Sequence, residues 1–367
     1  MKTKVAIVKC KNYERTRVEQ AVKAAFDLLG GLNAFVKKGE KVLIKPNILS
    51  ARLPEDGVCT HIEVIRAVVK SVRDCGAVPC IGDNPGGSIS PAKAYEGSGL
   101  TSLAKEERVE LKEAKDIKVV NGIPIATYFL ECDKIINLPK MKTHSLMGIT
   151  GAVKNMYGAV AGLHKSELHK KFPGPEEFTK VLVDTFEIVK LDLVLMDGVV
   201  AMDQQGPSSG RLRYPGLLIA GEDSVAIDSV FAELIGMKPL DILTTKEAYK
   251  RKLGEADLEN IEISGESIEE NLINDFKVPK KPGLITVLGP FAKFAARFIK
   301  FWPNIDERLC KKCIICQDTC PVSAIIINLK KSVIDLKRCI RCMCCHEVCP
   351  YKAIELKRNF LAKVFGL

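Results

Sequence analysis

Two cysteine runs near the C-terminal end constrain this chain more than any other feature of its sequence. Each run has the spacing C-x2-C-x2-C-x3-C-P; the first begins at Cys310 and the second begins 29 residues later, at Cys339. This spacing is typical of bacterial domains that bind two cubane iron–sulfur clusters. Three cysteines wrap a short loop around one cluster, and the fourth, which precedes proline, binds the other cluster. The two runs therefore predict a small unit with two related halves.

The crossed arrangement divides eight cysteines into two ligand sets, each expected to hold one [4Fe–4S] cluster. The first cysteine set is Cys310, Cys313, Cys316 and Cys349, and the second cysteine set is Cys339, Cys342, Cys345 and Cys320. The alternative is a pair of structural zinc sites, but those usually combine two C-x2-C pairs across a longer spacer. Cys344 and His346 also lie in the second run. We interpret Cys344 as a packed thiol, and His346 as a surface residue or a neighbour of the ligands.

The composition favours a cytoplasmic redox protein of an anaerobic, reducing environment. The chain has 14 cysteines among 367 residues, and its first residues, MKTKVAIVKC, lead into a strand rather than a signal peptide. Clustered cysteines in a chain without an export signal indicate metal binding rather than disulfides. The net charge is +10, but no nucleic-acid-binding module is recognisable, so we expect no nucleic acid partner.

Residues 1–275 alternate between apolar strand-like and amphipathic helical segments. Strands are predicted at 4–10, 41–48, 78–83, 134–138, 191–196 and 216–220, and helices at 17–29, 60–75, 176–189 and 224–235. Thr60 is the expected N-cap of the second helix. This alternation predicts an α/β domain with a mostly parallel sheet. Such sheets bind ligands in the loops at the carboxyl ends of their strands.

Three shorter segments complete the predicted organisation. Residues 276–303 contain six basic residues and no acidic ones, and form a basic and aromatic linker. Within the linker, 291–302 is predicted to be a helix whose aromatic face packs between the domains or on a partner protein; contact with a membrane surface is the second alternative. Residues 304–358 form the small α+β ferredoxin-like domain, and 359–367 form a tail. The sequence does not fix the oligomeric state.

A polar, glycine-rich segment follows the predicted strand at 134–138. Lysine supplies positive charge, and glycine lets the backbone approach a ligand closely. The segment is neither a P-loop nor a dinucleotide fingerprint. We expect it to bind a carboxylate or phosphate, with His144 also supplying a proton; a polar contact between domains is the alternative. The candidate catalytic residues here are Lys142, His144 and Lys154, and the candidate binding residues are Gly148, Thr150, Gly151 and Asn155.

Other polar positions are less distinctive. Asp197 follows a buried strand and is a further catalytic candidate. The segments 45–47 and 83–86 are explained equally well by turns that end strands. Three histidines, His61, His164 and His169, are expected to be exposed to solvent.

Three motifs in the large domain resemble a known family. They are Lys45-Pro46-Asn47; Lys142-x-His144 followed by T-G-A-x-K-N-x-x-G over 150–158; and D-G, A-M, G-P and G between Asp197 and Gly210. This pattern resembles the domain-of-unknown-function family 362. The resemblance covers residues 1–275, and many members carry the same C-terminal two-cluster fusion. It implies the fold and the cofactor, but no settled reaction.

These observations favour an iron–sulfur electron-transfer protein of the ferredoxin type. Its two [4Fe–4S] clusters would feed or drain electrons at an α/β domain that binds a small anionic substrate or a redox partner protein. The sequence leaves open whether the chain is a ferredoxin-dependent oxidoreductase, and it contains no flavin motif. The alternative is an electron carrier, or a maturation or delivery factor for a metal cofactor, in which the α/β domain serves only for docking.

Overall fold

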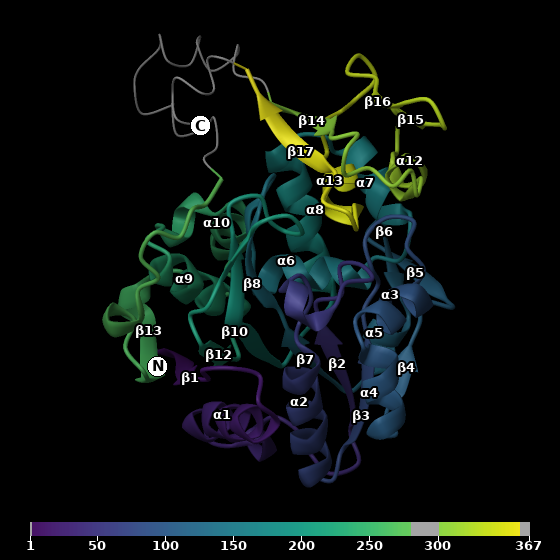
Figure 1. Cartoon of the computed structure of the whole chain (residues 1–367). Helices are drawn as coiled ribbons and strands as arrows, with labels where there is room; N and C mark the ends of the chain where they lie inside the picture. Colours follow the sequence, from purple (N-terminus) through teal and green to yellow (C-terminus); the bar gives the residue numbers. More distant parts are fainter. Residues whose placement is uncertain (1, 280–300, 360–367) are drawn as a thin grey trace.

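A mixed, largely parallel sheet forms the centre of the larger domain in the computed structural model, which describes residues 2–279 and 301–359 (Figure 1). Its main path runs β13-β1-β12-β10-β7-β2-β3-β4. The central strands β10, β7, β2 and β3 are parallel, whereas β12 is antiparallel to both of its neighbours. The strands are β1 (Thr3–Lys9), β2 (Lys41–Pro46), β3 (Val78–Gly82), β4 (Glu110–Lys112), β7 (Lys134–Leu138), β10 (Leu193–Asp203), β12 (Leu217–Gly221) and β13 (Ile261–Gly265). The predicted α/β class is confirmed.

Helices cover both faces of this sheet, which explains why its strands are apolar at successive positions. In β1, Ala6 packs in the core beneath α1 (Arg15–Leu28) and α2 (Ile62–Asp74), whereas Val5 and Ile7 pack on the opposite face with α9 (Ser224–Leu234). In β2, Leu43 packs with α8 (Pro175–Ile188). Alternate residues of a strand point to opposite faces, so each strand contributes to two cores.

Two local predictions in this domain are wrong. The N-cap of α2 is His61, whose side chain accepts a hydrogen bond from Glu63 N. The hydroxyl of Thr60 instead accepts from Asn47 N at 2.8 Å and donates to Leu138 O at 2.6 Å. The polar segment after β7 is a hairpin rather than a loop. Its strands are β8 (Lys140–His144), which pairs with β10, and β9 (Gly148–Thr150).

The small module repeats one motif twice, as the sequence predicts. Its antiparallel pairs are β14 (Phe301–Ile305) with β17 (Ile354–Arg358), and β15 (Ile325–Ile327) with β16 (Ser332–Ile334). Two short helices, α12 (Ile315–Thr319) and α13 (Cys344–Val348), follow the cysteine loops. Asp306 N bonds Ala353 O at 2.7 Å, and Asp335 N bonds Ala324 O at 2.7 Å. These two backbone hydrogen bonds thus join the two halves of the module.

The predicted linker helix falls largely outside the described residues. Positions 291–300 are not described, and Phe301 and Trp302 lie in β14, so the predicted end of the helix is wrong. Its predicted packing between the domains or on a partner protein, and the alternative of membrane contact, therefore stay predictions. Among the described helices, none has the length and apolar character needed to cross a membrane.

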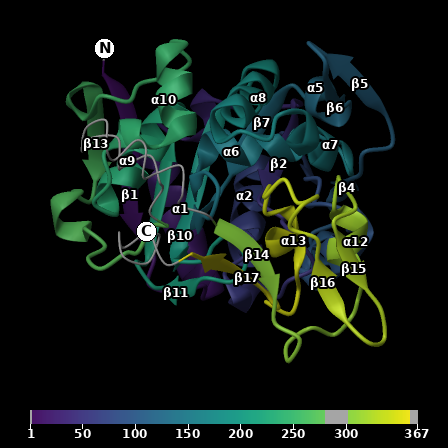
Figure 2. The ribbon, with the colours of Figure 1, turned by 90° about the horizontal axis from the view of Figure 1, so that it is seen from above.

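The small module contacts the larger domain through α12 and α13, the helices on its inner side (Figures 1 and 2). Ser88 N donates to Thr319 Oγ1 at 3.2 Å, and Ser208 Oγ donates to His346 O at 3.0 Å. A side chain on Gly87 would collide with Thr319. This close approach places the cysteine loops against loops that follow the sheet strands.

Candidate iron–sulfur centres and anion site

Two of the cysteine thiols, Cys316 and Cys339, have cysteines of their predicted sets as neighbours. Burial raises the pKa of Cys316 to about 12, and the next contributions come from Cys349, Cys313 and Cys310. Burial also raises the pKa of Cys339, with Cys342 and Cys320 among its charged neighbours. The cysteines that act on Cys316 and on Cys339 are therefore members of the same set, whereas Cys345 has Cys316 of the other set among its neighbours.

The loops between the cysteines have a repeated backbone geometry that suits a cluster. Left-handed residues recur at the same offsets in the two halves, at Lys312, Ile314 and Ser323, and at Arg341, Met343 and Lys352. Backbone N–H groups point at sulfur: Ala324 N lies 3.2 Å from Cys320 Sγ, and Ala353 N lies 3.3 Å from Cys349 Sγ. Such hydrogen bonds tune iron–sulfur clusters. Among the described residues, no three His, Cys, Asp or Glu converge on a point suited to a single ion. The assignment of iron–sulfur clusters to these loops therefore rests on the all-thiolate donor set and on the repeated loop geometry.

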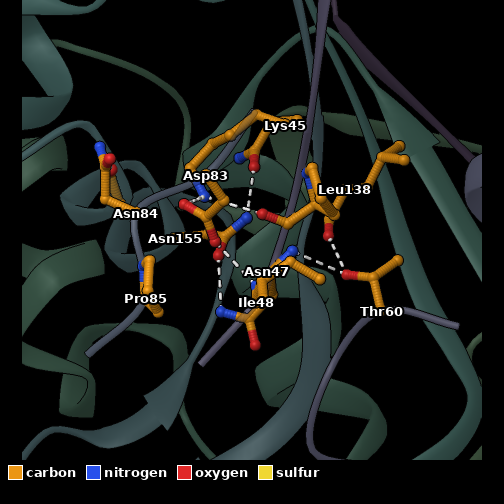
Figure 3. A network of polar contacts seen from close by, with 12 residues as sticks. Lys45, Asn47, Ile48, Thr60, Asp83, Asn84, Pro85, Leu138 and Asn155 are labelled. Atoms are coloured by element: carbon orange, nitrogen blue, oxygen red, sulfur yellow. Dashed lines mark hydrogen bonds and ion pairs between the residues drawn. The ribbon is translucent and has the colours of Figure 1, made fainter. Parts of the chain in front are cut away.

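A network of buried polar groups lies where β2, β3 and β7 end (Figure 3). Lys45 Nζ forms an ion pair with Asp83 Oδ1 at 2.8 Å, and Asp83 Oδ2 accepts from Ile48 N at 2.7 Å. Gly158 packs so closely on this pair that a side chain there would collide with Asp83. The segments 45–47 and 83–84, which the sequence explains as turns, are thus joined in one site.

Three amides connect this ion pair to the helix that follows β9. Asn47 Nδ2 donates to Asn155 Oδ1 at 2.8 Å, and Asn155 Nδ2 donates to Asn137 Oδ1 at 2.7 Å. Lys142 Nζ donates to Asn47 Oδ1 at 2.8 Å and also to Val58 O. Because each side chain of this network is hydrogen-bonded to another, the side chains are fixed before any ligand binds.

A cavity of about 70 Å³ lies between this network and the small module. Its wall in the larger domain includes Lys154, Lys165 and Asn155, with Thr150 and His169 beside them, and α13 contributes Cys344, Glu347 and Val348 opposite. A cavity of this size has room for several water molecules or one small ion. Cys344 directly precedes Cys345, so the cavity borders the second cysteine set.

The lysines around the cavity outnumber the carboxylates that form ion pairs with them. Lys45 and Lys140 pair with Asp83 and Asp197, but Lys142, Lys154 and Lys165 form no ion pair with the described residues. Glu347 is the carboxylate that acts on Lys154, and it lies on the opposite wall.

Burial makes these unpaired lysines unusually weak bases. It lowers the pKa of Lys142 to about 7 and that of Lys165 to about 8. It also lowers the pKa of Lys154. Burial disfavours the protonated amines. A bound anion would compensate for this, because an opposite charge favours the protonated form.

His144 is held as a neutral ring beside Glu347. Its Nδ1 accepts from Leu146 N and Met147 N, both at 3.1 Å, which leaves the proton on Nε2. That nitrogen lies 2.8 Å from Glu347 Oε1 on α13. Burial lowers the pKa of His144 to about 4, so the ring is neutral at pH 7. This geometry favours a role in holding Glu347 over the predicted role of proton donor.

Three predicted site residues lie away from the cavity. Asp197 is buried between Lys140 Nζ and Tyr13 OH, each at 2.8 Å. Gly148 occupies a left-handed position in the β8–β9 hairpin, and Gly151 leaves room for Asp228 at the start of α6 (Ala152–Asn155). The structure brings Lys154, Thr150 and Asn155 to the cavity wall. Lys142 and His144 contact the lining residues Asn47 and Glu347, respectively.

Several lining residues escaped the sequence analysis, among them Lys165 and His169 on α7 (His164–Lys171). Lys165 Nζ donates to the carbonyl oxygens of Asn84 and Pro85. His169 was expected to be exposed, but it is buried and stacks on Phe178 with ring centroids 3.8 Å apart. The available signal was the helical spacing that places both residues on one face with Leu168.

His61 was likewise expected in solvent. It is partly buried and stacks on Tyr13, with ring centroids 3.6 Å apart. His164 is half-buried, and its Nδ1 lies 2.9 Å from Glu167 Oε2.

Comparison with known proteins gives the family and the cofactor class. Residues 42–233 match the family model "Domain of unknown function (DUF362)", and residues 303–350 match a 4Fe-4S dicluster domain. The thylakoid-associated protein sll1697 of Synechocystis sp. is 30% identical over 309 residues, which cover 81% of this chain and 96% of that protein. The lactate racemase apoprotein of Thermoanaerobacterium thermosaccharolyticum aligns with 60% of this chain and 54% of its own, at 14% identity and a TM-score of 0.37. The chain thus belongs to the DUF362 family, and it carries a 4Fe–4S-binding domain with an iron–sulfur electron-transfer role.

Proposed function

We propose that the protein carries two [4Fe–4S] clusters and exchanges electrons with a small anionic substrate in the cavity between its two domains. The observation that carries this proposal is the pairing of the two walls. One wall presents Lys154 and Lys165, and the other is α13, which runs between cluster ligands. A substrate in the cavity would be bound by charge on one side and would face the second cysteine set on the other.

The buried lysines define the class of substrate. A cation would be repelled by Lys142, Lys154 and Lys165, and a large anion would not fit a cavity of about 70 Å³. Small carboxylates and oxyanions satisfy both conditions. Because Lys165 is buried, its charge interactions are stronger than those at an exposed surface.

The clusters would supply single electrons, and the side chains around the cavity would manage the charge. Reduction of a bound anion adds negative charge, which the ammonium groups of Lys154 and Lys165 stabilise. Lys142 donates a hydrogen bond to Asn47, which lines the cavity, and when protonated it adds positive charge behind that wall. His144 keeps Glu347 in place on the opposite wall rather than acting as the acid.

Reoxidation of the reduced protein by small anions tests this function. The holoprotein is reduced with dithionite, freed of excess reductant, and mixed anaerobically with pyruvate, fumarate, nitrite or sulfite while the cluster absorbance is followed. At least one anion should reoxidise the wild-type clusters. Lys154→Ala should slow that reaction by about tenfold or more, since it removes a charge from a low-dielectric site.

The matched control is Lys170→Ala, an exposed lysine on the same helix as Lys165. Its reoxidation rate should equal that of the wild type, and both variants should retain normal iron content. If no anion reoxidises the wild type, or if Lys154→Ala reacts at the wild-type rate, the cavity is not a substrate site. The larger domain would then be a docking module for a partner protein.

A further inference from the structure

The two halves of the small module differ in charge at two equivalent positions. In the first half, the cysteine loop and the β15–β16 turn form a surface, here called the lysine lobe, that comprises Lys311, Lys312, Leu329, Lys330 and Lys331. The 29-residue repeat places Ile340 where the first half has Lys311, and Asn359 where it has Lys330. Cluster binding therefore does not require lysine at these positions, and the lobe needs another explanation.

The lysine lobe lies beside the first cysteine set. Lys312 Nζ donates to Leu329 O and so joins the cysteine loop to the β15–β16 turn. The sulfur of Cys310 lies 3.5 Å from Ser332 Oγ at the start of β16. Figures 1 and 2 both show β15 and β16 on the outer side of the module, away from the larger domain. The lysine lobe thus lies beside Cys310 of the first set, whereas Cys344, which precedes Cys345 of the second set, lines the cavity.

The lobe combines unneutralised charge with an exposed apolar tip. Its four lysines form no ion pair among the described residues. The nearby carboxylates are already engaged: Glu307 accepts from Ser332 N, and Asp306 pairs with Arg308. Leu329 is 94% exposed. Positive charge around an apolar residue is typical of a surface that docks an acidic protein.

We propose that the lysine lobe docks an acidic one-electron carrier protein, which exchanges electrons with the cluster of the first cysteine set. One electron leaves the reduced centre of the carrier, which is oxidised, and enters this cluster, which is reduced; no atom is transferred. The second cysteine set lies next to the first, because Cys345 packs with Cys316 and Cys349 in one buried cluster. The inference rests on the proposed function only for the onward step to the cavity.

The rate of cluster reduction by two contrasting donors tests the proposal. One donor is a reduced, strongly acidic bacterial ferredoxin, and the other is reduced methyl viologen, a small cation. The test variant changes Lys311, Lys312, Lys330 and Lys331 to Glu. The control variant makes the same change of charge at exposed lysines of the larger domain, Lys37, Lys38, Lys246 and Lys250.

Reduction of the test variant by ferredoxin should be at least about tenfold slower than that of the wild type at low salt. The rate of reduction of the control variant by ferredoxin should fall much less. Added salt should slow the wild type with ferredoxin but speed the test variant, because it screens the attraction in the first case and the repulsion in the second. Reduction by methyl viologen should not be slowed in either variant. Should the charge reversal prevent cluster assembly, the corresponding four Lys→Gln changes give the same test with a smaller loss.

The proposal is overturned if ferredoxin reduces the test variant at the wild-type rate, or if the control variant is slowed as much. These outcomes are distinct from failure of the proposed function. Reoxidation by small anions can be measured after reduction with methyl viologen, which does not need the lobe. Leu329→Ser should also slow the ferredoxin reaction without a change of charge, since it removes the exposed apolar contact.

Discussion

Anion binding in the cavity should weaken as pH rises through neutrality, because Lys142 changes its charge there. Burial lowers the pKa of Lys142 from 10.5 to about 7, so the amine is protonated below pH 7 and neutral above it. Two unit charges on the order of 7 Å apart interact by about 2 kcal/mol at an effective dielectric constant of 20. An anion should therefore bind about thirtyfold more tightly to the protonated form.

By linkage, the bound anion raises the pKa of Lys142 by about 1.5 units, so affinity should fall mainly between about pH 7 and pH 8.5. Calorimetric titration with sulfate measures this, since sulfate keeps its charge across the range. Lys142→Met should remove most of the decrease and leave the smaller part due to Lys165, whose pKa is about 8. An affinity that is flat from pH 6 to pH 9 in the wild type, or an unchanged decrease in the variant, would refute this reasoning.

Three further predictions concern the clusters and the fold. Anaerobically purified protein should contain about eight irons and eight labile sulfides per chain, and Cys313→Ala should remove about half of each; zinc without sulfide contradicts the cluster assignment. Gly158→Ala should destabilise the fold by on the order of 3–5 kcal/mol, because the new methyl group collides with Asp83 in its buried ion pair. Thermal unfolding should show this loss, whereas Gly174→Ala meets only a flexible side chain and should change little; equal losses would refute the argument. Between about pH 7 and pH 10.5 the unfolded chain binds more protons than the folded one at Lys142, so wild-type stability should rise with pH relative to Lys142→Met; parallel curves of melting temperature against pH would contradict this.

The fold class was predictable from the sequence because its main signals are local. Apolar runs mark β1, β2, β3 and β7, and the amphipathic spacing of α8 and α9 gives their extents to within a residue or two. The cysteine spacing is also a local signal, since the loop around a cluster is set by neighbouring residues. These features need no knowledge of distant contacts.

The hairpin and the buried lysines were not predictable in this way. Lys140 and Lys142 lie in a strand because their ammonium groups meet Asp197 and Asn47, which come from distant parts of the chain. Without those partners, a lysine-rich segment resembles an exposed loop. His169 illustrates the same limit, because its burial depends on Phe178 and on the small module that closes the cavity.

An anaerobic crystal structure of the oxidised holoprotein grown with selenate tests the central claim most directly. Anomalous scattering from iron should show two four-iron clusters, one within each cysteine set. Anomalous scattering from selenium should show one selenate between Lys154 and Lys165, on the side of the cavity that faces Cys344. Two clusters with no selenate in the cavity would contradict the anion site, and metal other than iron at the cysteines would contradict the redox assignment itself.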